Sequence, residues 1–112
     1  MRPERWEDRV DDILAAIAKI QRYAGGLSRE AFAKDEKTID AILRNLSIIG
    51  EATGHIPPDV QARAPAIPWA KMRGMRHHIV HDYPHVDTMI VWVTITDDLP
   101  PVVGLLESLR RG

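Results

Sequence analysis

The sequence predicts an all-α protein, built as a bundle of helices in one domain. One apolar template, with residues at i, i+3, i+4, i+7 and i+10, occurs three times along the chain. The one segment dense in β-branched residues has no second strand to pair with, so its backbone groups would go unpaired in a strand. The length of 112 residues suits one hydrophobic core and is too short for two, so residues 1–112 are expected to form a single domain.

Two long helices are predicted in the first half of the chain. The template of the first consists of Val10, Ile13, Leu14, Ile17 and Ile20. Gly25-Gly26 follows it as a stop signal. The template of the second consists of Ile39, Ile42, Leu43, Leu46 and Ile49, and Gly54 with Pro57-Pro58 ends it. Between them, Ser28 can cap a short helix that runs through Phe32.

The next helix is expected to begin near Pro68. The stretch from Pro65 to Pro68 forces an irregular entry, because each proline restricts the preceding residue to extended conformations, and Pro68 can sit in a first helical turn. Pro84 should end this helix by pushing Tyr83 out of the helical region. One face of the helix then consists of Trp69, Met72, Arg76, Ile79, Val80 and Tyr83.

The last part of the chain is also predicted to be helical. Met89–Thr96 favours a strand by composition, but a lone strand would have no partner. As a helix it is apolar nearly all round, so it should be covered on more than one side, within the bundle or by a second copy of the chain. The final helix carries the third template, Leu99, Val102, Val103, Leu106 and Leu109. Asp97 or Asp98 can cap this helix, with Pro100 and Pro101 in its first turn.

Composition limits the classes of function. The chain is 45% apolar and 28% charged, as in soluble globular proteins, and it has no cysteine, which excludes disulfides, thiolate nucleophiles and cysteine-ligated zinc. The start of the chain lacks the apolar stretch of a signal peptide, and nowhere do about 18 apolar residues run together. A cytoplasmic protein without a membrane segment is expected.

The charge distribution points to one segment. The net charge of −1 is unlike the basic excess of most nucleic-acid binders. Residues 71–81 nevertheless contain basic and imidazole side chains and no acid, whereas the first twelve residues are rich in acids. A polyanion would therefore be met near residues 71–81.

The reactive side chains are concentrated in the run Arg76-His77-His78-Ile79-Val80-His81-Asp82-Tyr83. The guanidinium of Arg76 can match two phosphate oxygens and stabilise a pentacovalent transition state. An imidazole with a pKa of about 6.5, such as that of His81, can take a proton from a ribose 2′-hydroxyl or give one to a leaving 5′-oxygen. This pair suits metal-independent RNA cleavage that spares DNA and leaves a cyclic phosphate and a 5′-hydroxyl.

One chain alone looks insufficient for this chemistry. Residues five apart on an ideal helix lie about 140° from each other, so Arg76 and His81 share no face unless the helix frays before His81. If two copies pack with these helices adjacent, two arginines and two histidines can converge in one cleft, with one imidazole as acid and the other as base. Twofold symmetry is the commonest way for small proteins to associate.

Simpler interpretations stand beside these. His81 could be a structural histidine, and Arg76 could be held in an ion pair, with Glu51 as the candidate partner that orients it. Tyr83 could simply pack its ring at a helix end. Trp69 and Trp92 are expected in the core or an interface rather than as platforms for bases.

Two further groups of side chains allow more than one interpretation. Lys71, Arg73 and His78 fit a solvated face whose charge attracts phosphates, and direct contact with RNA is the alternative. His77, His81 and His85 are four apart and His77 with His81 could hold a metal, but only Asp82 or Asp87 could complete the shell. No metal and no cofactor is expected.

The chain resembles the HEPN superfamily, specifically the HepT-like toxins that are paired with a minimal nucleotidyltransferase antitoxin. The superfamily signature of an arginine, a polar residue and a later histidine is met by Arg76, His77 and His81, and the extended motif Arg-x4-His-x-Tyr by Tyr83. Flanking segments agree, and the resemblance covers residues 8–110. These segments are Arg44-Asn45-Leu46, Ile49-Gly50-Glu51-Ala52, Ile67-Pro68-Trp69, Gly74-Met75-Arg76, Val91-Trp92 and Asp98-Leu99-Pro100. His77 stands where the family usually has asparagine.

The resemblance implies an up-down helical bundle that forms a homodimer through the region of the motif helix, with the catalytic cleft at the interface. It implies a ribonuclease toxic to its host, with Arg76 and His81 as catalytic residues. It further implies control by the nucleotidyltransferase, which transfers AMP to Tyr83 and could join a larger hetero-oligomer. The alternatives are a companion subunit of the nucleotidyltransferase that binds a nucleotide or RNA without cutting it, and a purely structural helical dimer.

Overall fold

The fold is seen in a computed structural model that describes the backbone of residues 4–82 and 86–112 and the side chains of residues 4–76 and 86–112. Every regular element in these ranges is a helix, which confirms the all-α prediction. The elements are α1 (Trp6–Ala24), α2 (Arg29–Lys34), α3 (Glu36–Gly54), α4 (Pro58–Gln61), α5 (Trp69–Asp82), α6 (Thr88–Val93), the π-helical segment η1 (Thr94–Asp98) and α7 (Pro100–Arg111).

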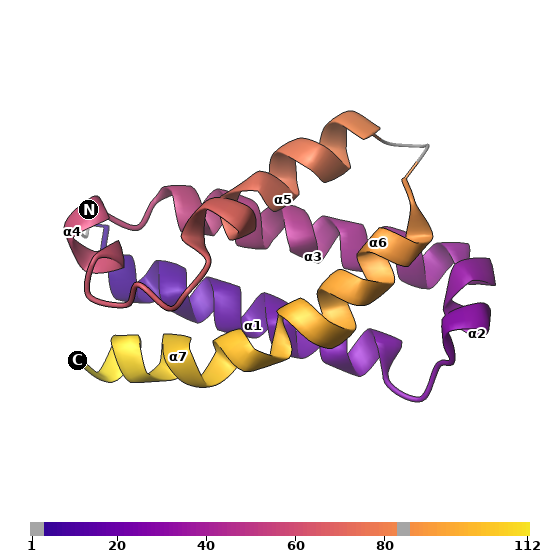
Figure 1. Cartoon of the computed structure of the whole chain (residues 1–112), viewed down its shortest axis with the longest axis horizontal. Helices are drawn as coiled ribbons and strands as arrows, with labels where there is room; N and C mark the ends of the chain where they lie inside the picture. Colours follow the sequence, from indigo (N-terminus) through magenta and orange to yellow (C-terminus); the bar gives the residue numbers. More distant parts are fainter. Residues whose placement is uncertain (1–3, 83–85) are drawn as a thin grey trace.

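The long helices run alternately up and down the bundle (Figure 1). α3 packs against α1 on one side and α5 on the other, and α7 lies along α1. All three apolar templates are confirmed, since most of their residues are buried in one core and Leu14, Ile39 and Val103 pack partly buried against it. In the last turn of α7, Arg110 Nε donates to Asp11 Oδ1 of α1 at 3.1 Å, which ties α7 to α1.

Polar caps fix the turn between α1 and α3. Ser28 Oγ accepts a hydrogen bond from the backbone N of Ala31 at 3.1 Å, as predicted, although α2 extends to Lys34. Asp35 Oδ1 accepts from the backbone N of Thr38 at 3.0 Å and so caps α3. This bond to Thr38 lowers the pKa of the Asp35 carboxyl below its ordinary value.

The segment predicted as Met89–Thr96 is helical, as expected, in α6 and η1. The predicted capping of the last helix by Asp97 or Asp98 is wrong. Leu99 precedes α7 with helical backbone angles, whereas a capping residue needs an extended backbone, and no side chain caps α7. Both aspartates lie inside η1 instead. Pro100 and Pro101 occupy the first turn of α7, as predicted.

These C-terminal helices bury one apolar side chain or more in almost every turn, namely Val91, Ile95, Leu99, Val102, Leu106 and Leu109. In the described part of the chain no single helix is both long and apolar enough to cross a membrane. Thr88–Asp98 and Pro100–Arg111 reach that length only when counted together, and they are bent by 50°.

Candidate active site

The start of α5 is held by its first residue. The indole Nε1 of Trp69 donates to the backbone carbonyls of Gln61 and Ala64, both at 3.1 Å, and the ring packs partly buried against the core. Pro68 directly precedes the helix, and its carbonyl accepts the first hydrogen bond of α5 from the backbone N of Met72 at 3.0 Å. Trp69 is therefore a core residue, as the sequence suggested, and it anchors α5 to the loop after α4.

α5 crosses α3 at Gly50, where the two backbones meet. A Cβ atom at Gly50 would lie 2.7 Å from both the Cβ and the N of Arg76, and 3.1 Å from the carbonyl oxygen of Arg73. Met72 and Met75 are the buried side chains of α5 in its described part. The face predicted from the sequence contains Met72 and Arg76 but not Met75. In the structure Met75 is buried with Met72, and Arg76 is exposed.

Arg76 lies exposed on α5, directly beside this crossing. Neither Arg76 nor Arg73 forms an ion pair with any described carboxylate, and both are exposed. Glu51 is exposed too, and the predicted Glu51–Arg76 pair is not formed in the part of the chain that the structure describes. An exposed guanidinium with no carboxylate partner is available to an anionic ligand.

Lys71 differs from the two arginines. Its Nζ lies 3.2 Å from Asp98 Oδ2, so it joins the first turn of α5 to η1, although the Lys71 side chain remains 63% exposed. The sequence grouped Lys71 with Arg73 and His78 as a solvated face that attracts phosphates. The structure shows that the charge of Lys71 is already balanced by an aspartate, so Arg73 and Arg76 carry the unbalanced positive charge among the described side chains of this helix.

Only the backbone of the motif histidines is described in the structure. His77, His78 and His81 belong to α5, which continues without a break to Asp82, so positions 76 and 81 are about 140° apart around its axis. Their side chains, and Tyr83 as a whole, are outside the described residues. The possible metal pair His77 and His81, with His85, lies outside them as well, and no group of three candidate ligands occurs among the side chains that are described.

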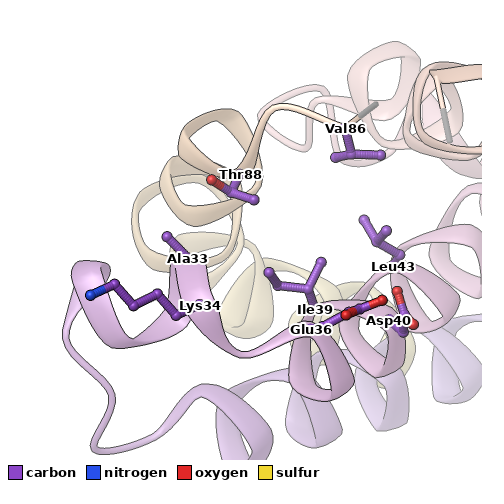
Figure 2. Close-up of a pocket in the computed structure, with 8 residues that line it drawn as sticks. All are labelled: Ala33, Lys34, Glu36, Ile39, Asp40, Leu43, Val86 and Thr88. Carbon is purple, nitrogen blue, oxygen red and sulfur yellow. The ribbon is translucent and has the colours of Figure 1, made fainter. Parts of the chain in front are cut away.

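The side of the molecule near the end of α5 carries a hollow of about 360 Å³ (Figure 2). Aliphatic side chains of Ile39, Leu43 and Val86 line it, and the carboxylates of Glu36 and Asp40 stand at its rim. Sequence reasoning missed this hollow, because it forms only where α2, α3 and the segment before α6 come together.

Next to this hollow, α6 exposes an apolar face. Met89, Ile90 and Val93 are 43%, 64% and 40% exposed. The neighbouring Val91 is buried, and Trp92 packs on Phe32 with ring centroids 5.2 Å apart. We expected α6 to be covered on more than one side. Within one chain, the bundle covers only the side that carries Val91 and Trp92.

Two residues that shape the site were not singled out from the sequence. Asp98 was expected to cap a helix, yet it pairs with Lys71. Gly50 was noted only within a flanking motif, although a glycine in the middle of a strong helical template is costly and usually has a packing reason. That interruption of the template is the signal that could have identified the crossing.

Comparisons with known proteins identify a family for this chain. Residues 13–109 match the family described as HepT-like, Ribonuclease HepT-like. A Thermococcus cleftensis protein named "Probable ribonuclease HepT" is 39% identical over 105 residues, which cover 94% of this chain and 96% of that protein. A Methanocaldococcus jannaschii protein provisionally named RNase MJ0125 is 33% identical over 100 residues, which cover 89% of this chain and 86% of the relative.

A Caldanaerobacter subterraneus protein provisionally named RNase TTE0752 is 37% identical over 86 residues, or 77% of each chain. No solved structure matches the chain. The matched region spans α3, α5 and the run that begins at Arg76, so it contains both the crossing and the exposed arginine. The chain belongs to the HepT-like ribonuclease family.

Proposed function

We propose that this protein is a metal-independent endoribonuclease in which Arg76 stabilises the scissile phosphate and His81 transfers protons. The ribose 2′-oxygen attacks the phosphorus while His81 of one copy takes its proton. The bond to the 5′-oxygen breaks as a second imidazole protonates that oxygen. The products are a 2′,3′-cyclic phosphate and a 5′-hydroxyl, and DNA is spared because it lacks the nucleophile.

One observation carries the proposal: Arg76 is exposed on a helix whose position is fixed and has no described carboxylate to neutralise it. A guanidinium held on a rigid element stabilises the charge that develops on phosphate oxygens in the transition state. The membership in a ribonuclease family supports RNA as the phosphodiester.

The active centre is proposed to form between two copies of the chain. The unbroken course of α5 supports this, because positions 76 and 81 of one copy do not share a face. The exposed apolar face of Met89, Ile90 and Val93, only a few residues after α5, also supports it, since apolar surface of this kind is typical of association sites. A charge at Ile90, as in Ile90→Asp, should weaken the dimer. Val91 and Trp92 on the same helix are less suitable for this test, because both pack within the monomer.

The biological setting is proposed to be that of a cytoplasmic toxin silenced by a cognate minimal nucleotidyltransferase. AMP on Tyr83, which follows α5 directly in the sequence, would add negative charge and bulk, which would repel an RNA backbone. Tyr83→Phe should then remain toxic in the presence of the nucleotidyltransferase. If that enzyme still silences this variant through covalent AMP, Tyr83 is not the acceptor.

The direct test is incubation of the purified protein with RNA in excess chelator, beside His81→Ala and a DNA strand of the same sequence. We expect cleavage of RNA by the wild type only, with cyclic phosphate ends. Intact RNA with retained RNA binding would instead indicate the non-catalytic companion subunit. Cleavage that needs an added divalent ion would point to the histidine cluster as a metal site.

A further inference from the structure

Gly50 of α3 lies where the backbone of α5 comes close to the backbone of α3. The position is buried, and α5 packs against α3 (Figure 1). A methyl group there would be 2.7 Å from the Cβ and the backbone N of Arg76. Carbon atoms in ordinary contact are about 3.5–4.0 Å apart, so α5 would have to move by about 1 Å to admit it.

The atoms around Gly50 cannot give way by a change of rotamer. They are the backbone N and Cβ of Arg76 and the backbone oxygen of Arg73, all fixed to the frame of α5. A Cβ at position 50 would therefore displace the helix itself. The displacement would be centred on Arg76, the residue whose guanidinium is proposed to stabilise the phosphate.

The described contacts of α5 before Arg76 are compatible with such a movement. Its first residue, Trp69, stays attached through two hydrogen bonds to carbonyls of the preceding loop. The buried side chains between this anchor and Arg76 are Met72 and Met75, and methionine adapts readily to altered space. α5 would pivot about Trp69, so Arg76 would move while the start of the helix stayed in place.

We infer that Gly50 is a positioning residue for Arg76: the missing side chain lets α5 sit close enough to α3 to place the guanidinium at the scissile phosphate. This inference rests on the proposed ribonuclease function. It assigns to Gly50 no contact with RNA, and its effect is exerted through the position of α5, first of all at Arg76.

The chain offers two matched controls. Gly54 is in the same helix and Gly104 is in α7, and a Cβ at either position would meet nothing within 4 Å. Gly54→Ala and Gly104→Ala therefore gain helix propensity as Gly50→Ala does, but they add no contact with α5. Both are expected to keep the wild-type rate and to raise the Tm.

The test compares kcat and KM for RNA cleavage by Gly50→Ala and by the two controls. We expect Gly50→Ala to lower kcat about tenfold or more, since a shift of about 1 Å is costly for transition-state contacts, with KM within about twofold of the wild type. In an Arg76→Ala background, Gly50→Ala should lower kcat by a clearly smaller factor, because the contribution of Arg76 is already absent and only the displacement of later residues of α5 remains. A loss of equal size in that background would overturn the inference, because Gly50 would then act on the rate without Arg76.

A second measurement separates this inference from the proposed function. The ¹⁵N Nε resonance of Arg76 is followed while a 2′-O-methyl RNA oligonucleotide, which cannot be cleaved, is added to each variant. We expect the Arg76 resonance to respond in the wild type and in Gly54→Ala, and to respond differently in Gly50→Ala. An identical response in Gly50→Ala would overturn the positioning role. If the wild type cleaves no RNA and yet the resonances differ as expected, the ribonuclease function fails and the placement of Arg76 by Gly50 stands.

The same variants show whether a lowered kcat of Gly50→Ala comes only from unfolding. If Gly50→Ala alone is unfolded at the assay temperature, it is combined with Gly54→Ala and Gly104→Ala, which add helix stability. A folded triple variant with lowered kcat supports the inference. A triple variant that stays unfolded overturns it, because Gly50 would then be a requirement of the fold and not of the position of Arg76.

Discussion

α3 contacts α1 and α5 in two different ways. Against α1 it presents the apolar template, and side chains such as Ile17, Ile42 and Leu46 fill the space between the helices. Against α5 it presents Gly50, where the absence of a side chain brings the backbones together. α5 buries only Met72 and Met75 in its described part and exposes Arg73 and Arg76.

The two contacts of α3 therefore have different roles in the molecule. The contact between α1 and α3 depends on buried apolar area, which is spread over many residues and stabilises the whole domain. α5 is held by several different contacts: the glycine crossing with α3, the buried Met72 and Met75, the hydrogen bonds of Trp69 to the loop after α4, and the ion pair of Lys71 with Asp98 of η1. A helix held in this way leaves its outer positions free for charged groups, which suits a helix that carries a reactive site.

The largest effect on stability is expected from Leu46→Ala, on the α1 side of this comparison. Leu46 is fully buried, and truncation of such a side chain removes apolar contacts and leaves a cavity. The free energy of unfolding should fall by about 2–5 kcal/mol, measured by urea denaturation. The rate of RNA cleavage per folded molecule should remain near that of the wild type. A change of less than about 0.5 kcal/mol would mean that the α1–α3 core is not the main source of stability.

The opposite pattern is expected from Arg76→Ala, on the α5 side. The exposed side chain makes no ion pair with a described residue, so the free energy of unfolding should change by less than about 0.5 kcal/mol. The kcat for RNA cleavage should fall by about 100-fold or more, as when one donor to a transition-state oxyanion is removed. Arg73→Ala is the matched control on the same helix and should mainly raise KM. Equal losses of kcat in both variants would mean that Arg76 contributes only general positive charge and makes no specific contact with the reacting phosphate.

A smaller effect is expected from Trp69→Phe, which keeps an aromatic ring but removes the indole N–H. The carbonyls of Gln61 and Ala64 would lose their shared donor, at a cost of about 1 kcal/mol in the free energy of unfolding. Amide hydrogen exchange should become faster at the start of α5 and stay unchanged in α1. Uniform acceleration over the whole chain would show that α5 does not open independently of the α1–α3 pair.

The smallest effect is expected from Asp35→Ala, which removes the cap of α3. The bond from Thr38 holds the pKa of the folded Asp35 carboxyl below its ordinary value, so its stabilising contribution is present above the unfolded pKa of about 3.9. That contribution is lost as the pH falls through the still lower folded pKa. The Tm should therefore drop by a few degrees at pH 7, with a difference from the wild type that shrinks below about pH 4. Asp35→Asn keeps an acceptor and should lose less at pH 7.

Much of this fold follows from the sequence because its long helices obey a simple period. The templates around Ile17, Leu46 and Leu106 predicted which faces are buried, and Ser28 predicted the start of α2. The position of Asp98 could not be predicted in the same way. Its partner Lys71 is distant in the chain, and the π-helical turn that replaces a capped start of α7 has no local signature.

The candidate site was predicted in part. The exposure of Arg76 and the absence of a described partner fit the chemistry expected from its sequence context, but the expected pair with Glu51 is not formed. Pairing depends on how two helices rotate against each other, which periodicity does not specify. The roles of Arg76, His81 and Tyr83 and the twofold association stay predictions.

The most direct test of a cleft shared by two copies is a subunit-mixing titration. Wild-type protein is mixed with His81→Ala at fixed total concentration, left until the subunits have exchanged, and assayed for RNA cleavage in chelator. If one imidazole acts as base and the other as acid, as proposed, mixed dimers should be nearly inactive, and the activity should follow the square of the wild-type fraction. A straight-line decrease with the wild-type fraction would contradict the shared cleft and place a complete site in each chain.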